Sequence, residues 1–234
     1  MKIALAFVSV VSSLSQCDPN LLSCPTKGLD SCCTPAIGSL VLAQQWISGL
    51  GPVDAFTLHG LWPNHCDGTF TPSNGCDSRR LYKNVSQIVK GDDDLYEDMQ
   101  TYWPSYKGNA GEFWSHEWGK HGTCLSTVEP RCLANSTPGE DVLAYFRLAL
   151  KNRDKFDLFK VLSSQNIMPG RSYPRQDILN ALATMGADSV LICKGKKLQE
   201  VRSTFHVRGS DDYVIVDNPA KSNCPSTITY ERKV

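Results

Sequence analysis

The alternation of apolar and polar positions predicts a β-strand over residues 54–62. Phe56 and Leu58 fall on one face of this strand, and Thr57 and His59 fall on the other. His59 would therefore project toward a polar cleft. The same period of two returns late in the chain, where strands are predicted over residues 189–193, 198–207 and 213–216.

Helical periodicity dominates the middle of the chain. Thr137-Pro-Gly-Glu140 reads as a capping box with proline at the first helical position, followed by a buried apolar stripe. Asp92, Asp93 and Asp94 suit a helix N-terminus, where the macrodipole favours negative charge. Helices are predicted over residues 78–89, 92–103, 112–123, 137–152, 155–164 and 175–185. Residues 37–50 fit either a helix or a strand.

Together these elements predict a single α+β domain over residues 16–234. We expect an antiparallel sheet with helices packed mainly on one side, braced by disulfides. About 219 residues (234 minus 15) are enough for one sizeable core and show no internal repeat.

Residues 1–15 have the pattern of a signal peptide. Lys2 supplies the positive start, an apolar run follows, and Ser13 and Ser15 are small residues suited to cleavage before Gln16. The run is too short to span a bilayer. We expect a protein secreted to the extracellular space or delivered to a vacuolar or lysosomal lumen, with no membrane attachment.

The ten cysteines all follow this segment, and an even count in a secreted chain predicts five disulfides. Adjacent Cys32 and Cys33 would hardly bridge each other, so each is expected to bind a different region. No Cys-x-x-Cys pair occurs, which counts against redox or zinc chemistry. Asn84-Val-Ser and Asn135-Ser-Thr predict glycosylated surface loops.

Formal charge is balanced, with 24 basic and 24 acidic residues. A tight, sequence-independent nucleic-acid binder needs a broad basic face. Any contact with nucleic acid is therefore expected to be transient and local, made by a monomer.

The most concentrated chemistry lies in the predicted helix 112–123. His116, Glu117, Lys120 and His121 share an arc of roughly 140° with Phe113 at helical spacing. Trp114 and Trp118 flank this arc as an apolar edge. Ser115, Gly119 and Gly122 lie opposite, where small side chains would allow close packing.

Two other interpretations of this cluster remain open. The first is a solvated amphipathic helix whose histidines only form hydrogen bonds. The second is a zinc site, but the zincin pattern requires His-Glu-x-x-His, and Lys120 occupies the position of the second histidine.

A pair of histidines can act as base and acid in one turnover, because imidazole titrates near pH 6.5. Lys120 could neutralise developing negative charge, and Glu117 could orient a partner or donate to an oxygen. The set lacks a nucleophile, since Cys124 is expected in a disulfide. It therefore suits RNA, whose 2′-OH can attack the adjacent phosphorus, whereas DNA lacks that hydroxyl.

Two segments carry a resemblance to a known family. Phe56-Thr-Leu-His-Gly-Leu-Trp-Pro63 and Phe113-Trp-Ser-His-Glu-Trp-Gly-Lys-His-Gly-Thr-Cys124 resemble the two active-site segments of the ribonuclease T2 family. The cysteine layout is similar to that of its fungal branch. The resemblance implies a metal- and cofactor-independent endoribonuclease with little base specificity and an acidic optimum. Its products would be 2′,3′-cyclic phosphates, slowly hydrolysed to 3′-phosphates.

The resemblance also implies a role for each residue of the cluster. His121 would be the general base on the 2′-OH, and His59 the general acid on the leaving oxygen. His116 would hold the phosphate, while Glu117 and Lys120 would stabilise the pentavalent phosphorane. The implied disulfides are Cys17–Cys33, Cys24–Cys66, Cys32–Cys132, Cys76–Cys124 and Cys193–Cys224.

Base binding requires flat apolar partners. Trp62 and Phe70 are expected to form one stacking slot, with Phe113 also assigned to the substrate. Asn64 both donates and accepts hydrogen bonds, so a strict adenine preference, which an acceptor-only Asp would favour, is less expected. Residues 103–105 could border a second base site. His65 and His206, without supporting partners, are interpreted as structural.

Two functions from other classes stand as alternatives. A non-catalytic relative serving in storage or recognition would be expected to lose a catalytic histidine, yet all three are present. A metalloenzyme would lose activity with a chelator, which neither other hypothesis predicts.

Overall fold

The computed structural model describes residues 17–24, 28–134, 136–209, 212–218 and 220–234. The predicted signal peptide and Asn135 lie outside these residues. Within them, no helix is both long enough and apolar enough to cross a membrane.

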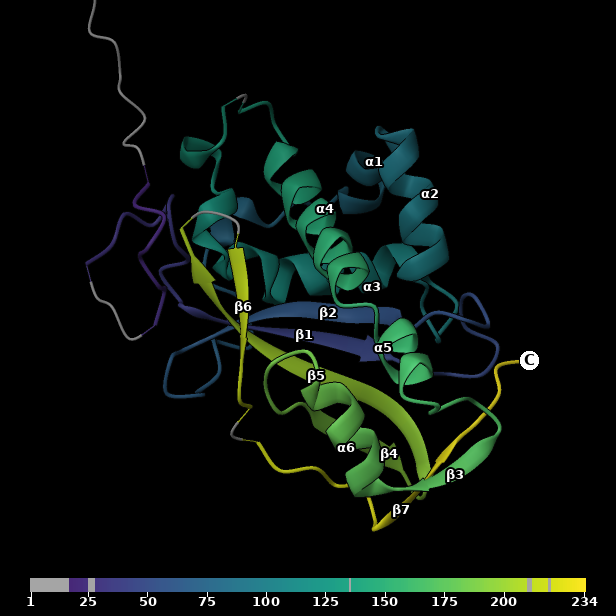
Figure 1. The fold of residues 1–234 in the computed structure, drawn as a ribbon. Helices are drawn as coiled ribbons and strands as arrows, with labels where there is room; N and C mark the ends of the chain where they lie inside the picture. The colour runs from purple at the N-terminus through teal and green to yellow at the C-terminus, as the bar shows by residue number, and fades with distance from the viewer. Residues whose placement is uncertain (1–16, 25–27, 135, 210–211, 219) are drawn as a thin grey trace, which may run out of the picture.

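The centre of the fold is a seven-stranded sheet arranged around the long strand β5 (Lys197–Arg208), which pairs with four others (Figure 1). Its order is β2-β1-β5-β7-β3, with β4 and β6 also paired to β5. The remaining strands are β1 (Ser39–Gln45), β2 (Thr57–Asn64), β3 (Arg171–Pro174), β4 (Val190–Lys194), β6 (Asp212–Val216) and β7 (Thr227–Tyr230).

The predicted α+β class is confirmed, although the sheet is mixed, because β7 runs parallel to β5 and the other pairings are antiparallel. The ambiguous stretch 37–50 contains strand β1. Strands β3 and β7 were not predicted, since both are only 4 residues long and carry little periodicity.

In the part of the chain that the structure describes, six α-helices cover the sheet. They are α1 (Val85–Lys90), α2 (Asp93–Tyr102), α3 (Ala110–Lys120), α4 (Glu140–Lys155), α5 (Leu158–Ser164) and α6 (Arg175–Ala183). Short 3₁₀ helices are η1 (Ser78–Arg80), η2 (Gly122–Cys124), η3 (Ser126–Val128) and η4 (Pro130–Cys132). The predicted cap at Asp92 is confirmed, because its carboxylate accepts the Leu95 N–H.

The predicted helix 78–89 is instead divided into η1 and α1. A continuous helix would use the Arg80 carbonyl within its own ladder. In the structure this carbonyl accepts the indole N–H of Trp118 at 2.7 Å, and the Arg80 side chain forms a buried ion pair with Asp141. Tertiary contacts therefore outweigh local helix propensity here.

The predicted capping box at Thr137 is wrong. Helix α4 begins at Glu140, and its N-cap is Gly139 in a left-handed conformation with φ 91°. The Thr137 carbonyl accepts the Glu140 N–H, which makes residues 137–140 a turn. Glycine permits this backbone, which a capping residue in the extended region would not adopt.

The predicted helix 112–123 begins two residues earlier and ends sooner. Asn109 caps α3 by accepting the Glu112 N–H, and His121 is the C-cap residue before η2. The predicted helix 155–164 begins later, at Leu158, because Asp157 caps α5 by accepting the Lys160 N–H, and Lys155 is the last residue of α4.

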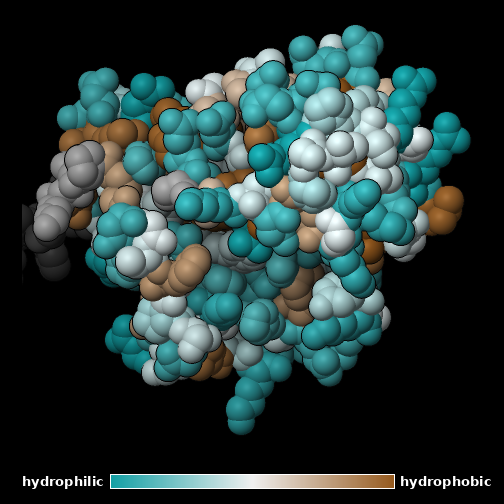
Figure 2. Space-filling view, turned by 90° about the horizontal axis from the view of Figure 1, so that it is seen from below, coloured by the Kyte–Doolittle hydropathy of each residue, from teal (hydrophilic) through white to brown (hydrophobic). Residues whose placement is uncertain are grey.

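The helices lie on one face of the sheet, as predicted. Helices α1–α4 pack over β1, β2 and one end of β5, burying Leu40, Leu58 and Phe205 in one core. Helices α5 and α6 pack over β4, β7 and the other end of β5, burying Ile178 and Val201 in a second core (Figure 1). Seen from below the view of Figure 1, the surface shows hydrophobic residues only in small separate groups (Figure 2).

The five disulfides implied by the family resemblance are all formed: Cys17–Cys33, Cys24–Cys66, Cys32–Cys132, Cys76–Cys124 and Cys193–Cys224. Adjacent Cys32 and Cys33 do bind different regions of the chain.

The C-terminal end of α3 is clamped by the loop around Gly75. Cys76 is bonded to Cys124, and its N–H donates to the Thr123 hydroxyl, which in turn donates to the Gly119 carbonyl. Gly75 has φ +83°, and a Cβ there would lie 2.1 Å from the Gly119 carbonyl oxygen. Only glycine allows this approach.

Replacing Gly75 tests the clamp. Gly75→Ala should lower the free energy of unfolding by about 3 kcal/mol, because it combines a disfavoured positive φ with a backbone clash. Gly108→Ala is the matched control: Gly108 has φ +88° with nothing within 4 Å, so only about 1 kcal/mol should be lost. Equal losses in chemical denaturation would contradict the close approach.

Candidate active site

A cavity of about 260 Å³ opens where the C-terminal end of α3 meets β2. It contains all the predicted catalytic residues and, of the predicted base-binding residues, Trp62, Asn64 and Phe70. Phe113 does not line it, and its ring centroid lies 5.9 Å from that of His59. The lining residues are His59, Trp62, Asn64, Phe70, Thr71, His116, Glu117, Lys120, His121 and Arg202.

His59 lies at an irregularity of strand β2. Ala43 of β1 pairs with Gly60, and the next residue, Gln44, pairs with Leu58. No residue of β1 therefore pairs with His59, which forms a β-bulge. A bulge redirects a side chain, which is useful beside a functional site. The His59 carbonyl accepts the indole N–H of Trp103 at 3.0 Å, and this bond holds the bulge against the core.

Trp103 itself is fully buried and offers no face to a base. The predicted second base site at residues 103–105 therefore cannot use this ring.

Trp62 and Glu117 join the strand to the helix. The indole Nε1–H of Trp62 donates to Oε2 of Glu117 at 2.9 Å. A Cβ on Gly60 would lie 2.2 Å from each of these two atoms, so the glycine between His59 and Trp62 makes the contact possible. Trp114 and Trp118, predicted to form an edge of α3, are its buried face together with Glu117.

Burial raises the pKa of Glu117 to about 7. The side chain is only 1% exposed, and its desolvation outweighs the opposing effects of His59, Trp62 and Lys120. Glu117 is therefore largely a neutral carboxylic acid in the mildly acidic range, where it can donate a hydrogen bond.

His121 is shifted in the direction that favours its neutral form. Burial, followed by repulsion from Lys120, His116 and His59, lowers its pKa to about 3. Its Nδ1 is buried and has no hydrogen-bond partner among the described residues. Burial also lowers the pKa of the more exposed His116, with Lys120 adding to the shift.

The indole of Trp62 brings the two sides of the cavity together. The His59 ring meets it edge-on at 4.9 Å between centroids, and the His121 ring stacks on it at 5.4 Å. One imidazole from β2 and one from the end of α3 therefore flank the same indole.

Glu200 and Arg202 of β5 complete the site and were not identified from the sequence. Oε2 of Glu200 lies 2.6 Å from Nδ1 of His59, and Nε of Arg202 donates to Oε1 of Glu200 at 2.6 Å. The Arg202 guanidinium lies 5.1 Å from the Trp62 ring centroid. The sequence does offer one signal, because Glu200 and Arg202 are charged residues two apart in a predicted strand and therefore share one face. That this face lies beside His59 depends on the order of the strands in the sheet, which the sequence pattern does not give.

The predicted base-binding residues lie at the mouth of the cavity. Asn64 and Phe70 are paired by an isolated β-bridge, and the Phe70 ring is 81% exposed. A groove of about 630 Å³ continues from Trp62, Asn64 and Phe70 across the helix-free face of the sheet. It passes Thr204 and His206.

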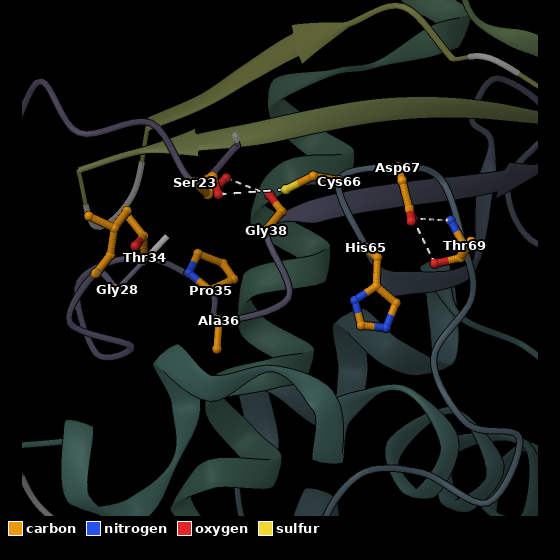
Figure 3. Close-up of a pocket in the computed structure, with 11 residues that line it drawn as sticks. Ser23, Gly28, Thr34, Pro35, Ala36, Gly38, His65, Cys66, Asp67 and Thr69 are labelled. Atoms are coloured by element: carbon orange, nitrogen blue, oxygen red, sulfur yellow. Dashed lines mark hydrogen bonds between the residues drawn. The ribbon is translucent and has the colours of Figure 1, made fainter. Parts of the chain in front are cut away.

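A separate cavity of about 680 Å³ lies beneath the N-terminal segment (Figure 3). His65 and Asp67 line it, but the Asp67 carboxylate is engaged by the backbone and hydroxyl of Thr69. Within the described ranges, no three His, Cys, Asp or Glu side chains are grouped so as to hold a metal ion.

Comparison with known proteins agrees with this geometry. The chain matches the model of the Ribonuclease T2 family over residues 29–217. It is 42% identical to Ribonuclease Rh of Rhizopus niveus over 238 residues, covering 100% of both chains.

Among solved structures, Actibind, described as a T2 ribonuclease, superposes with a TM-score of 0.86 at 35% identity, covering 93% of this chain and 98% of that chain. A point mutant of RNase MC1 in complex with 5′-GMP gives a TM-score of 0.59 at 27% identity, covering 82% of this chain and 100% of that chain. The chain belongs to the ribonuclease T2 family and is an endoribonuclease.

Proposed function

We propose that this ribonuclease cleaves single-stranded RNA by transphosphorylation, through 2′,3′-cyclic phosphates to 3′-phosphate ends. We further propose little base specificity and an acidic pH optimum. The observation that carries this proposal is the pair of imidazoles, His59 and His121, that flank Trp62 in one cavity with Glu117 and Lys120.

In the first step His121 accepts the proton of the 2′-OH. Its lowered pKa keeps the imidazole neutral above about pH 3, so a free lone pair is present throughout the acidic range. The 2′-oxygen then bonds to phosphorus, the P–O5′ bond breaks, and His59 donates a proton to the departing O5′. RNA supplies the nucleophile, which explains why the site needs none; DNA, without the 2′-OH, would not be cleaved.

The phosphorane between these states carries extra negative charge on its equatorial oxygens. Lys120 neutralises this charge, protonated Glu117 donates a hydrogen bond to it, and His116 holds the phosphate at the exposed side. No metal or cofactor is required by this sequence of steps.

The acidic optimum follows from the two opposite pKa shifts. Below about pH 3 the base His121 is protonated. Above about pH 7 Glu117 is ionised and would repel the phosphorane instead of donating to it. The active range therefore lies between these limits.

Weak base specificity follows from stacking. Trp62 and the exposed Phe70 offer flat faces to any base, and Asn64 can present either its amide N–H or its carbonyl. Phe113, beside His59, is assigned to the nucleotide at the cavity wall. The complex of RNase MC1 with 5′-GMP supports nucleotide binding at a site of this fold.

We also propose that the protein is a secreted monomer, or one held in a vacuolar or lysosomal lumen. Five disulfides support an oxidising compartment. Asn84 is exposed next to α1, in agreement with glycosylation there; Asn135 remains a prediction from its sequon.

Removing either imidazole tests the acid–base assignment. His59→Ala and His121→Ala should each lower kcat/KM on a dinucleotide by about 10²–10⁴-fold, because proton transfer is lost. His65→Ala, in the separate cavity, is the control and should cleave normally. Chromatography should identify a 2′,3′-cyclic phosphate product. A folded variant of either catalytic histidine with near-wild-type cleavage would refute the assignment.

Glu117 predicts a specific dependence of stability on pH. Its pKa is raised from 4.5 to about 7 in the folded protein, so the folded state keeps a proton that the unfolded state releases. The contribution of Glu117 to stability therefore falls as pH rises from about 4.5 to 7 and then levels off.

Glu117→Gln should abolish this loss, because the amide oxygen still accepts from Trp62 but cannot ionise. The free energy of unfolding of the variant minus that of wild type should therefore rise by about 2–3 kcal/mol between pH 4 and pH 8. Denaturant titrations at both pH values measure this. Glu112→Gln, an exposed residue of the same helix, is the control. A difference that does not depend on pH would argue against a protonated Glu117.

Asn64 predicts a change in base preference. Asn64→Asp would leave only acceptors opposite the base, which favours the adenine amino group over the carbonyl groups of guanine and uracil. We expect the ratio of kcat/KM for adenine over uracil at the 5′ nucleotide to rise by about tenfold, equivalent to one hydrogen bond. Thr71→Ala serves as a size control at the same cavity. An unchanged ratio would remove Asn64 from base recognition.

A further inference from the structure

Glu200 is a buried carboxylate held between the His59 imidazole and the Arg202 guanidinium. It is 6% exposed; its Oε2 lies 2.6 Å from Nδ1 of His59, and its Oε1 accepts from Nε of Arg202 at 2.6 Å. Burial alone would raise the pKa of Glu200, but the hydrogen bond and charge of His59, with Arg202, lower it below its ordinary value. Glu200 is therefore ionised in the acidic range.

The sheet is built so that this carboxylate reaches the histidine across an intervening strand. Strand β1 separates β2 from β5, and its residue Ala43 pairs with Gly60 on one side and Arg202 on the other. Ala43 has only a methyl group, which leaves room above it. The bulge at His59 and the register of Glu200 opposite Gln45 bring the two side chains together.

The contact determines which nitrogen of His59 can react. An ionised carboxylate only accepts hydrogen bonds, so Nδ1 must carry the hydrogen. The other ring nitrogen, Nε2, is then the atom free to hold and transfer the catalytic proton. After that transfer the neutral ring retains Nδ1–H, which is the tautomer that can take a proton from water when the cyclic phosphate is hydrolysed.

The charges around His59 make this carboxylate important. From α3 and its C-cap, Lys120, His116 and His121 face the same cavity. The Lys120 ammonium disfavours a second positive charge there, whereas the lowered pKa values of His116 and His121 favour their neutral forms. Glu117 is largely neutral below pH 7, because its pKa is raised to about 7. From β5, the Glu200 carboxylate places a negative charge in direct contact with the His59 ring through Oε2. Arg202 orients this carboxylate by binding its other oxygen, Oε1.

We propose that Glu200 is the positioning residue of His59: it fixes the Nδ1–H tautomer, aims Nε2 at the leaving O5′ and stabilises the imidazolium that must donate. This inference rests on the proposed role of His59 as general acid. Arg202 supports it by holding the Glu200 carboxylate in place.

The test is the pH dependence of Glu200→Gln, which keeps the shape of the side chain but removes its charge. The limb is measured in the Glu117→Gln background, because Glu200 also raises the pKa of Glu117 and the ionisation of Glu117 must not contribute. The alkaline limb of kcat/KM on a dinucleotide should then move about one to two pH units lower. Activity should fall about 10–100-fold near pH 6.5, mainly in kcat, and much less near pH 4. Glu200→Asp, which restores the carboxylate, should return the limb toward its wild-type position.

Glu231→Gln is the matched control, because Glu231 forms an ion pair with Lys197, the first residue of β5, and is not among the residues that line the cavity. It should leave the profile unchanged. A uniform loss of activity at every pH in Glu200→Gln, without movement of the limb, would show a merely structural role and overturn the proposal.

A second measurement does not depend on the folding of any Glu200 variant. ¹⁵N NMR of the wild-type protein, with the His59 signals assigned by their absence in His59→Ala, should show the neutral ring as the Nδ1–H tautomer. The Nε2–H tautomer would overturn the proposal. An active His59→Ala protein would instead refute the general-acid role itself, so the two failures are distinguishable.

Discussion

The site depends on one hydrogen bond, from the indole of Trp62 in β2 to the carboxyl of Glu117 in α3. It spans the space that a side chain at position 60 would fill, so the strand and the helix approach closely only because Gly60 has none. This contact places one aromatic plane between the imidazoles of β2 and α3. It also keeps the Glu117 carboxyl out of water, and the proton affinity of that group follows from the same burial.

The electrostatics of the cavity then follow from desolvation acting on groups of opposite type. Burial raises the pKa of a carboxyl and lowers that of an imidazole, and here it does both within a single turn of chain, at Glu117 and His121. An acid kept protonated and a base kept neutral coexist between about pH 3 and 7. The acidic range proposed for activity would in this sense be a consequence of packing, because neither pKa would be shifted in this way on an open surface.

Much of this could be predicted from the sequence, because the proposed catalytic cluster is local. Four of its members lie within six consecutive residues at the end of α3 and its C-cap, and His59 lies in a strand with a clear period. The bulge that aims His59 and the approach of Glu200 could not be predicted, since both depend on the register of β1 between its neighbours. The helix predicted to start at Thr137 starts later, because Gly139 adopts a left-handed conformation. The helix predicted across Arg80 is broken, because the Arg80 carbonyl accepts the indole N–H of Trp118. In both places these contacts outweigh local helix propensity.

The arrangement of layers explains how a chain without net charge can act on a polyanion. The helices occupy one face of the sheet, which leaves the other face open as the groove that continues from Trp62 past Thr204. With 24 basic and 24 acidic residues, little affinity is available from counterion release. In the proposed function, binding rests on stacking at Trp62 and Phe70 and on the cations at the scissile phosphate. Such a surface would hold RNA briefly, which suits an enzyme that must release each fragment before the next cut.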